Sequence, residues 1–231
     1  MSDTSREACG SGSGDLAGAI AAEALRLGID LPPGTAGRLV AYATSLWAWN
    51  ERLNLTRHTD VSRFVSRDIG DTTALIPHLA HGERVLDVGT GGGVPGVILA
   101  ILRPDLRVEL SESVAKKARA VAEIVREAGL VIPVHAAAAQ ELVASRPAGV
   151  ARFDTLVARA VAPLAKLFGW FEPRADAFGR LLVIKGPRWE EELAEARARR
   201  LGKKVSIRRI ASWPLRGTDN ESVLLEIRAA S

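Results

Sequence analysis

The 231-residue chain has little of several features that stabilise or localise other proteins. It contains one cysteine, Cys9, so no disulfide can form within the chain, as is typical of proteins from a reducing compartment. Its longest apolar run, about Val94 to Leu102, is far shorter than the roughly 20 residues that a membrane-spanning helix needs. The first residues, Met-Ser-Asp-Thr-Ser-Arg, lack the apolar stretch of a secretory signal. We therefore expect a cytoplasmic protein that does not associate with membranes.

Strong charge and metal-ligand patterns are lacking too. The chain has 31 Lys and Arg against 27 Asp and Glu, a formal net charge of +4. This balance permits binding to nucleic acid without demanding it. The four histidines, at positions 58, 78, 81 and 135, do not have the spacing of metal ligands, and no Ser-His-Asp arrangement is evident. We expect no metal site and no catalytic base.

What is present is enough apolar sequence, 47%, for a sizeable core. Residues 1–14 are small and polar, and we expect a disordered leader there. Residues 15–80 have helical periodicity and predict an N-terminal helical cap. Its helices would begin at Asp15, as an N-cap, at Thr35 and at Asp60.

Residues 81–231 alternate between strand and helix patterns and predict a single domain. We expect strands at 84–88, 106–111, 131–135, 153–158, 179–185, 203–210 and 222–228. We expect helices at 95–103, 114–128, 138–145, 161–171 and 188–201. Strands separated by helices favour a parallel, doubly wound sheet, whereas the last two strands are separated only by a turn near Pro214–Gly217. The predicted fold class is α/β, with a Rossmann-like, mostly parallel sheet and an antiparallel C-terminal strand.

The glycine-rich segment 84–96 reads Arg-Val-Leu-Asp-Val-Gly-Thr-Gly-Gly-Gly-Val-Pro-Gly, which predicts a strand, a tight turn and the start of a helix. The dehydrogenase pattern G-x-G-x-x-G fits only when it starts at Gly91. An Asp at the end of the strand is instead typical of the D-x-G-x-G-x-G loop of S-adenosylmethionine-dependent methyltransferases. Asp87, Gly89, Gly91 and Gly93 match that loop. The pattern favours S-adenosylmethionine as cofactor, with a dinucleotide-dependent oxidoreductase as the alternative.

An acid follows the next expected strand. Glu112 stands about 25 residues beyond Asp87, where a carboxylate can accept hydrogen bonds from both ribose hydroxyls of a nucleotide. An acid near the start of a helix also stabilises that helix through its dipole. Both roles remain open for Glu112.

Several further segments accompany the glycine loop in one order. They are Trp-Asn-Glu-Arg-Leu-Asn-Leu-Thr at 49–56, Glu112-Ser113 with Lys116-Lys117, Arg159-Ala160-Val161-Ala162-Pro163-Leu164, and Lys185-Gly186. With the loop, they resemble the 16S ribosomal RNA guanine-N7 methyltransferase family, also called glucose-inhibited division protein B. The resemblance covers residues 35–228.

The resemblance implies a class I methyltransferase sheet with a helical cap, S-adenosyl-L-methionine as cofactor, and ribosomal RNA or the small ribosomal subunit as partner. The cofactor-binding residues would be Asp87, Gly89, Gly91, Gly93 and Val94 in the loop, Glu112 on the ribose, Ala139 and Gln140 beside the adenine, and Arg159. Asn54 and Lys185 would lie nearer the guanine and position it. Guanine N7 carries a lone pair and no proton, so direct in-line attack needs no general base, and catalysis would be mostly positioning.

The chain departs from the family at three positions. Asp68 stands where the family has His, and Ala138 and Gln140 stand where it has Arg and Glu. The loss of that Arg and that Glu removes polar contacts near the cofactor and the substrate. All three departures leave the RNA target open. A noncatalytic RNA-binding or ribosome-assembly factor with a vestigial pocket therefore stays an alternative function.

Overall fold

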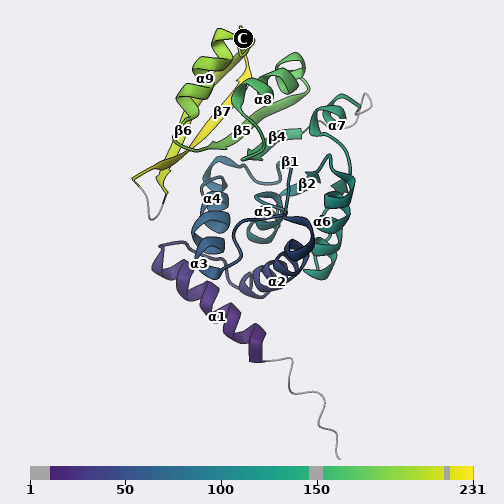
Figure 1. Ribbon diagram of the computed structural model, residues 1–231, viewed down its shortest axis with the longest axis vertical. Coiled ribbons are helices and arrows are strands. Elements are labelled where there is room, and N and C mark those ends of the chain that lie inside the picture. Colours follow the sequence, from purple (N-terminus) through teal and green to yellow (C-terminus); the bar gives the residue numbers. More distant parts are fainter. Residues whose placement is uncertain (1–10, 146–152, 216–218, 231) are drawn as a thin grey trace, which may run out of the picture.

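The computed structural model describes residues 11–145, 153–215 and 219–230, with side chains from residue 15 onwards. Within these ranges seven strands form one sheet, in the order β3-β2-β1-β4-β5-β7-β6 (Figure 1). Strands β1 to β5 run parallel to one another, and β7 is antiparallel to both β5 and β6. The expected mostly parallel sheet with an antiparallel C-terminal strand is confirmed.

The bounds of the α/β elements follow the predicted alternation closely. The strands are β1 (Arg84–Val88), β2 (Arg107–Ser111), β3 (Val134–His135), β4 (Phe153–Arg159), β5 (Phe178–Lys185), β6 (Val205–Pro214) and β7 (Glu221–Ala229). The helices are α5 (Gly96–Leu102), α6 (Ala115–Glu127), α7 (Ala139–Ser145), α8 (Leu164–Phe171) with the short 3-10 turn η3 (Glu172–Arg174), and α9 (Trp189–Ala198).

Strand β3 is shorter than the sequence indicates. We expected a strand at 131–135, but only Val134 and His135 pair with β2. Pro133 has no N–H to give to a ladder, although its carbonyl accepts the amide of Leu110 at 2.9 Å. Val131 is fully exposed, so no burial holds the preceding residues in the sheet.

The N-terminal segment is helical, as expected, with different details. Its elements are α1 (Ser11–Arg26), α2 (Ala36–Leu53), α3 (Val61–Arg63), the π-helical η1 (Phe64–Ile69), α4 (Gly70–Thr73) and the 3-10 turn η2 (Ile76–His78). Helix α1 begins before Asp15, so Asp15 is not its N-cap, and helix replaces part of the expected leader; residues 1–10 lie outside the described ranges. Thr35 does occupy the N-cap position of α2, but its hydroxyl donates to the carbonyl of Pro32 instead of accepting from the helix.

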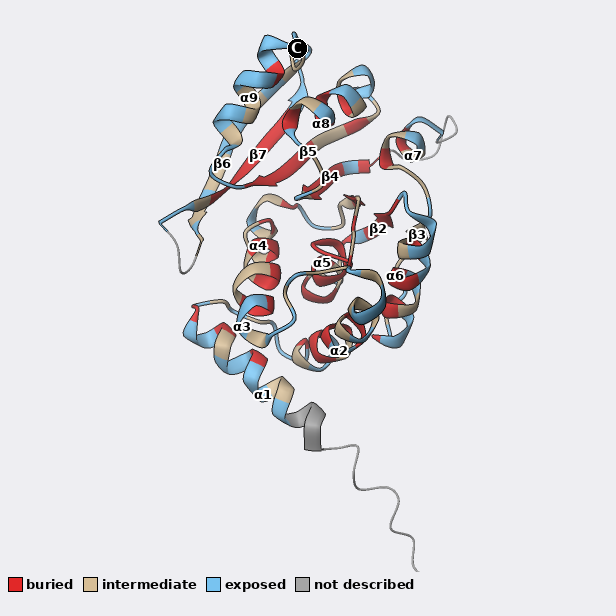
Figure 2. Ribbon diagram, viewed as in Figure 1, coloured by how far each residue is buried: buried red, intermediate tan, exposed pale blue. Residues whose placement is uncertain are grey.

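Two apolar layers cover the two faces of the sheet. One packs α1, α2, η1, α5 and α6 against inward residues such as Val85, Leu110 and Leu182. The other packs α7, α8 and α9 against residues that alternate with these, such as Leu86 and Leu181. Figure 2 shows the result, with α5 and β7 largely buried and α1 and α9 largely exposed on their outer sides.

The sheet order creates a crevice beside β1. The connection after β1 leads to β2 on one side, whereas β4 pairs with β1 on the other. Ligands of open α/β sheets bind at the carboxyl ends of the strands at such a point, where the strand order reverses. The glycine-rich segment follows β1 at this point of the fold.

Candidate functional site

The side chain of Asp87 holds the glycine-rich loop from inside the protein. Asp87 is fully buried, and its Oδ2 accepts hydrogen bonds from the Thr90 hydroxyl at 2.5 Å and from the Gly96 amide at 2.9 Å. These contacts join the end of β1 to both the turn and the start of α5. Its other oxygen, Oδ1, is buried without a hydrogen-bond partner among the described residues. Burial raises the pKa of Asp87 to about 7, although both hydrogen bonds act to lower it.

The backbone of the loop depends on glycine. Gly89 has φ +61°, and a Cβ added there would stand 2.9 Å from Cγ1 of Val161. Gly93 has φ +107°, and its Cβ would meet the Val97 side chain at 2.7 Å. Any other residue would be strained at these positions and would also collide with a neighbour. The cap contributes directly, because the Tyr42 hydroxyl of α2 donates to the Gly92 carbonyl at 3.0 Å.

Glu112 lies just after β2, beside this loop. One carboxylate oxygen accepts the Gly91 amide at 3.2 Å, and the other accepts the Val114 amide at 2.8 Å. Val114 is the N-cap of α6, so Glu112 does stabilise the start of that helix, as one of its two expected roles requires. The same carboxylate is tied to the loop, where it stands beside the crevice.

A cavity of about 930 Å³ opens at this edge of the sheet. The expected residues that line it are Asn54, Gly89, Gly91, Val94, Arg159 and Lys185. Asp87, Gly93, Glu112, Ala139 and Gln140 are not among the lining residues. Asp87 is buried beneath the loop, Gly93 is buried within it, and Ala139 is buried at the start of α7.

Asn54 and Lys185 enter the cavity from opposite parts of the chain. Asn54 ends α2 as its C-cap in the left-handed conformation, with φ 48°, and is exposed. Lys185 ends β5 and is buried; its Nζ donates to the Ala162 carbonyl at 3.0 Å and pairs with Glu192 Oε2 at 2.5 Å. Glu192 of α9 lines the cavity as well.

Arg159, at the end of β4, is held by two buried carboxylates of the cap. Its guanidinium donates to Asp68 Oδ1 at 2.5 Å and to Asp71 Oδ2 at 3.1 Å, and also to the Arg67 carbonyl. Burial acts to lower the pKa of Arg159, but the charges of Asp68 and Asp71 outweigh it and raise the pKa. The aspartate that departs from the family pattern is therefore an ion-pair partner of an expected site residue.

Four other groups at this cavity were not expected as site residues from the sequence. His58, Arg67, Asp71 and Ser222 line it, and Trp213 of β6 donates its indole N–H to Asp71 at 2.9 Å. Long-range packing brings them together. Nothing in the neighbouring sequence marks these residues as parts of one site. Only Arg67 and Asp71 stand in the same short segment as Asp68, which departs from the family pattern.

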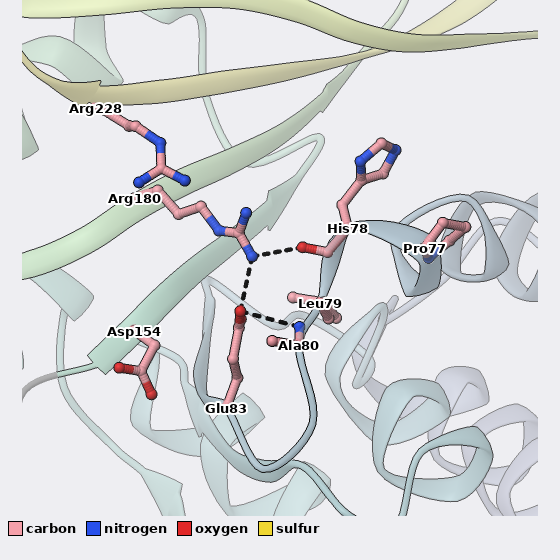
Figure 3. A pocket seen from close by; sticks show the side chains of 8 residues that line it. All are labelled: Pro77, His78, Leu79, Ala80, Glu83, Asp154, Arg180 and Arg228. Carbon is pink, nitrogen blue, oxygen red and sulfur yellow. Dashed lines mark hydrogen bonds and ion pairs between the residues drawn. The ribbon is translucent and has the colours of Figure 1, made fainter.

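A second hollow, of about 410 Å³, lies near the opposite ends of the strands (Figure 3). Its central cation, Arg180 of β5, donates to Glu83 at 2.9 Å and to the His78 carbonyl at 2.5 Å. Glu83 in turn accepts the Ala80 amide, as the dashed lines show. These contacts join the segment before β1 to the sheet. The guanidinium of Arg180 is therefore already hydrogen-bonded within the protein.

Within residues 11–145, 153–215 and 219–230, no group of three or more His, Cys, Asp or Glu side chains is arranged to hold a metal ion. None of the helices in these ranges is both long enough and apolar enough to cross a membrane.

The fold and the glycine loop at its switch point define a Rossmann-like domain of the class I methyltransferase type. Solved structures agree on the fold: MtNAS in complex with MTA and tNA has a TM-score of 0.56 at 15% identity, covering 85% of this chain and 76% of that one. A putative rRNA-methylase from Clostridium thermocellum has a TM-score of 0.51 at 15% identity, covering 71% of this chain and 96% of that one.

Sequence comparison then places the chain within that class. The sequence model of rRNA small subunit methyltransferase G (GidB) matches residues 36–213. A ribosomal RNA small subunit methyltransferase G from Rhodopirellula baltica is 46% identical over 195 residues, covering 84% of this chain and 81% of its own. The namesake from Sorangium cellulosum is 38% identical over 174 residues, covering 74% and 72%. The chain belongs to the rRNA small subunit methyltransferase G family.

Proposed function

We propose that this protein is an S-adenosylmethionine-dependent methyltransferase that modifies guanine N7 in small-subunit ribosomal RNA. One combined observation carries the proposal. The family match spans residues 36–213, and within it the glycine-rich loop lines a cavity of about 930 Å³ at the carboxyl ends of the strands. The relatives are named as ribosomal RNA small subunit methyltransferases.

The residues present fit the cofactor. The loop lines the cavity with bare backbone at Gly89 and Gly91, which lets a ligand approach the main chain closely. The strand order β3-β2-β1-β4 decides which part of the cofactor would lie at the end of which strand. Its adenine would lie toward Ala139 and Gln140, its ribose at Glu112, and its amino-acid end toward Arg159. Asp87 would act through the loop, whose shape it fixes.

When bound, S-adenosylmethionine supplies an electrophilic methyl group. Guanine N7 has a lone pair and no proton, so the residues around it need not remove one. Their task is to orient the base and exclude water. Asn54 is exposed at the cavity and can turn to the base, whereas Lys185 is already fixed by Ala162 and Glu192. Lys185 would therefore offer its remaining N–H as a preorganised donor to an acceptor on the guanine, such as O6.

Ribosomal RNA or the small ribosomal subunit is the partner that fits this reaction, and the cytoplasm is where it would be met. The net charge of +4 favours a polyanionic partner. Contacts between lysine or arginine and phosphate would make the affinity for RNA fall steeply with salt.

The test is methyl transfer from labelled S-adenosylmethionine to small-subunit RNA from a strain without its own enzyme of this family, offered naked and as assembled subunits. We expect incorporation into at least one of these substrates. Calorimetry with S-adenosylhomocysteine and with NAD, on the same preparation, checks the cofactor. Binding of NAD without S-adenosylhomocysteine would support an oxidoreductase instead. Binding of S-adenosylhomocysteine without transfer to either substrate would favour a noncatalytic factor.

A further inference from the structure

The imidazole of His58 is fixed at the cavity by a buried carboxylate. Its Nδ1 lies 2.7 Å from Oδ1 of Asp68, and Asp68 has no exposed surface. The His58 ring lines the cavity and keeps 23% of its side chain exposed. A fixed ring that remains accessible differs from a histidine that only fills a core.

The contact with Asp68 determines where the imidazole proton lies. A carboxylate only accepts hydrogen bonds, so Nδ1 of His58 carries the N–H. The same Oδ1 also accepts a hydrogen bond from the guanidinium of Arg159 at 2.5 Å, so this oxygen already acts as an acceptor. In the neutral ring the second nitrogen, Nε2, then has a free lone pair. Nε2 has no hydrogen-bond partner among residues 11–145, 153–215 and 219–230.

The fold places this lone pair at one particular end of the cavity. His58 follows the loop whose Leu55 carbonyl lies 3.3 Å from the position of a Cβ on Gly92, so the loop overlies the glycine-rich segment. Through Asp68, His58 is joined to Arg159 at the end of β4. This is the β1–β4 side of the crevice, where the amino-acid end of the cofactor meets the guanine under the proposed function.

We propose that Asp68 holds His58 in the Nδ1–H tautomer so that Nε2 accepts a hydrogen bond from an N–H group of a molecule bound in this cavity. The inference rests on the proposed function for the identity of that molecule. N–H donors of two molecules would meet there: the α-ammonium group of the cofactor, and the N1–H and 2-amino groups of guanine. His58 contacts the ligand, and Asp68 is a positioning residue.

Two substitutions separate ligand contact from mere support of Asp68. In His58→Asn the short amide can still donate near the place of Nδ1, so it keeps the contact with Asp68, but it has no atom where Nε2 stood. In His58→Gln the longer amide reaches toward the place of Nε2 and can offer its oxygen there. The matched control is His81→Gln, because His81 pairs with Asp105 and is 90% exposed, away from the cavity.

The experiment measures binding of S-adenosylhomocysteine and of 5′-methylthioadenosine by calorimetry, and kcat and KM for the RNA substrate at saturating cofactor. If Nε2 meets the ammonium group, His58→Asn weakens S-adenosylhomocysteine about tenfold and leaves methylthioadenosine, which lacks that group, unchanged. If Nε2 meets guanine, both Kd values stay unchanged and kcat/KM for RNA falls about tenfold. In either case His58→Gln retains more function than His58→Asn.

Two results would overturn the inference. One is a His58→Asn variant that behaves like His81→Gln in every measurement; the other is the reverse order, with Asn retaining function and Gln losing it. Wild-type protein that binds S-adenosylhomocysteine but methylates no RNA would instead overturn the proposed function. The inference is then judged on the two Kd values alone, and an unchanged affinity for S-adenosylhomocysteine in His58→Asn refutes it.

Discussion

The buried carboxyl of Asp87 gives a prediction about stability. Its pKa is raised by burial from 3.8 to about 7, so the charged form is the disfavoured one in the folded protein. A group whose folded pKa lies above its unfolded pKa contributes most at low pH, and that contribution is lost as the pH rises through the folded pKa. Each pKa unit corresponds to about 1.4 kcal/mol, so a rise from about pH 5 to about pH 8, through the folded pKa, lowers the free energy of unfolding by about two units, or roughly 3 kcal/mol.

Asp87→Asn removes this ionisation while keeping an oxygen for the Thr90 hydroxyl and the Gly96 amide. Its new NH₂ group takes the place of the buried Oδ1 that lacks a partner. The free energy of unfolding therefore also changes by an amount that does not depend on pH. The pH dependence is the quantity of interest. Urea unfolding of both proteins between about pH 5 and pH 8 measures it, and taking the difference removes the titration of distant groups.

We expect Asp87→Asn to gain roughly 3 kcal/mol relative to the wild type over this interval, the two-unit loss worked out above. Parallel pH profiles for the two proteins would refute the reasoning. They would mean that Asp87 keeps an ordinary pKa in the fold, and that its burial is compensated by the loop.

Three other substitutions test the site. Gly89→Val should abolish binding of S-adenosylhomocysteine, because the new side chain meets Val161 at φ +61°; Gly169→Ala, with open space around its Cβ, is the calorimetric control. Arg159→Met leaves two buried carboxylates without their cation and should lower the free energy of unfolding in urea by about 3–5 kcal/mol. Lys185→Met should lower kcat for RNA at least about tenfold while changing the affinity for S-adenosylhomocysteine less than about twofold.

For each of these three substitutions, one result would contradict the prediction. Normal S-adenosylhomocysteine binding by Gly89→Val would mean that the cofactor does not approach this loop. An Arg159→Met protein as stable as the wild type would mean that its carboxylate partners are not charged. A Lys185→Met protein that loses cofactor affinity in parallel with turnover would place Lys185 at the cofactor and not at the guanine.

The sheet could be predicted from the sequence because its signals are local. Alternating strand and helix patterns, the glycine-rich turn and the missing helix before β7 each depend on neighbouring residues. The exceptions depend on tertiary contacts. The stretch before Val134 has strand-forming residues, but no neighbouring strand buries them. Helix α1 runs past Asp15, where a polar residue with cap propensity offered an apparent start.

The candidate site divides in the same way. The loop glycines and Glu112 could be found from spacing, because their roles follow from one turn and one strand end. The departure at Asp68 could be seen in the sequence, but its meaning could not. Its partners His58 and Arg159 lie 10 and 91 residues away, and only packing of the cap on β4 brings them together. Glu192 could not be found from spacing either, because it meets Lys185 only where α9 lies beside the end of β5.

The most direct test of the account is to map N7-methylguanosine in small-subunit ribosomal RNA. A strain without its own enzyme of this family is complemented with the wild-type chain or with Gly89→Val, and N7-methylguanosine is located by chemical cleavage of the RNA. The account predicts N7-methylguanosine with the wild type and none with the variant. Ribosomal RNA without N7-methylguanosine in the presence of the wild-type protein, or carrying the new methyl group on another atom, would contradict it.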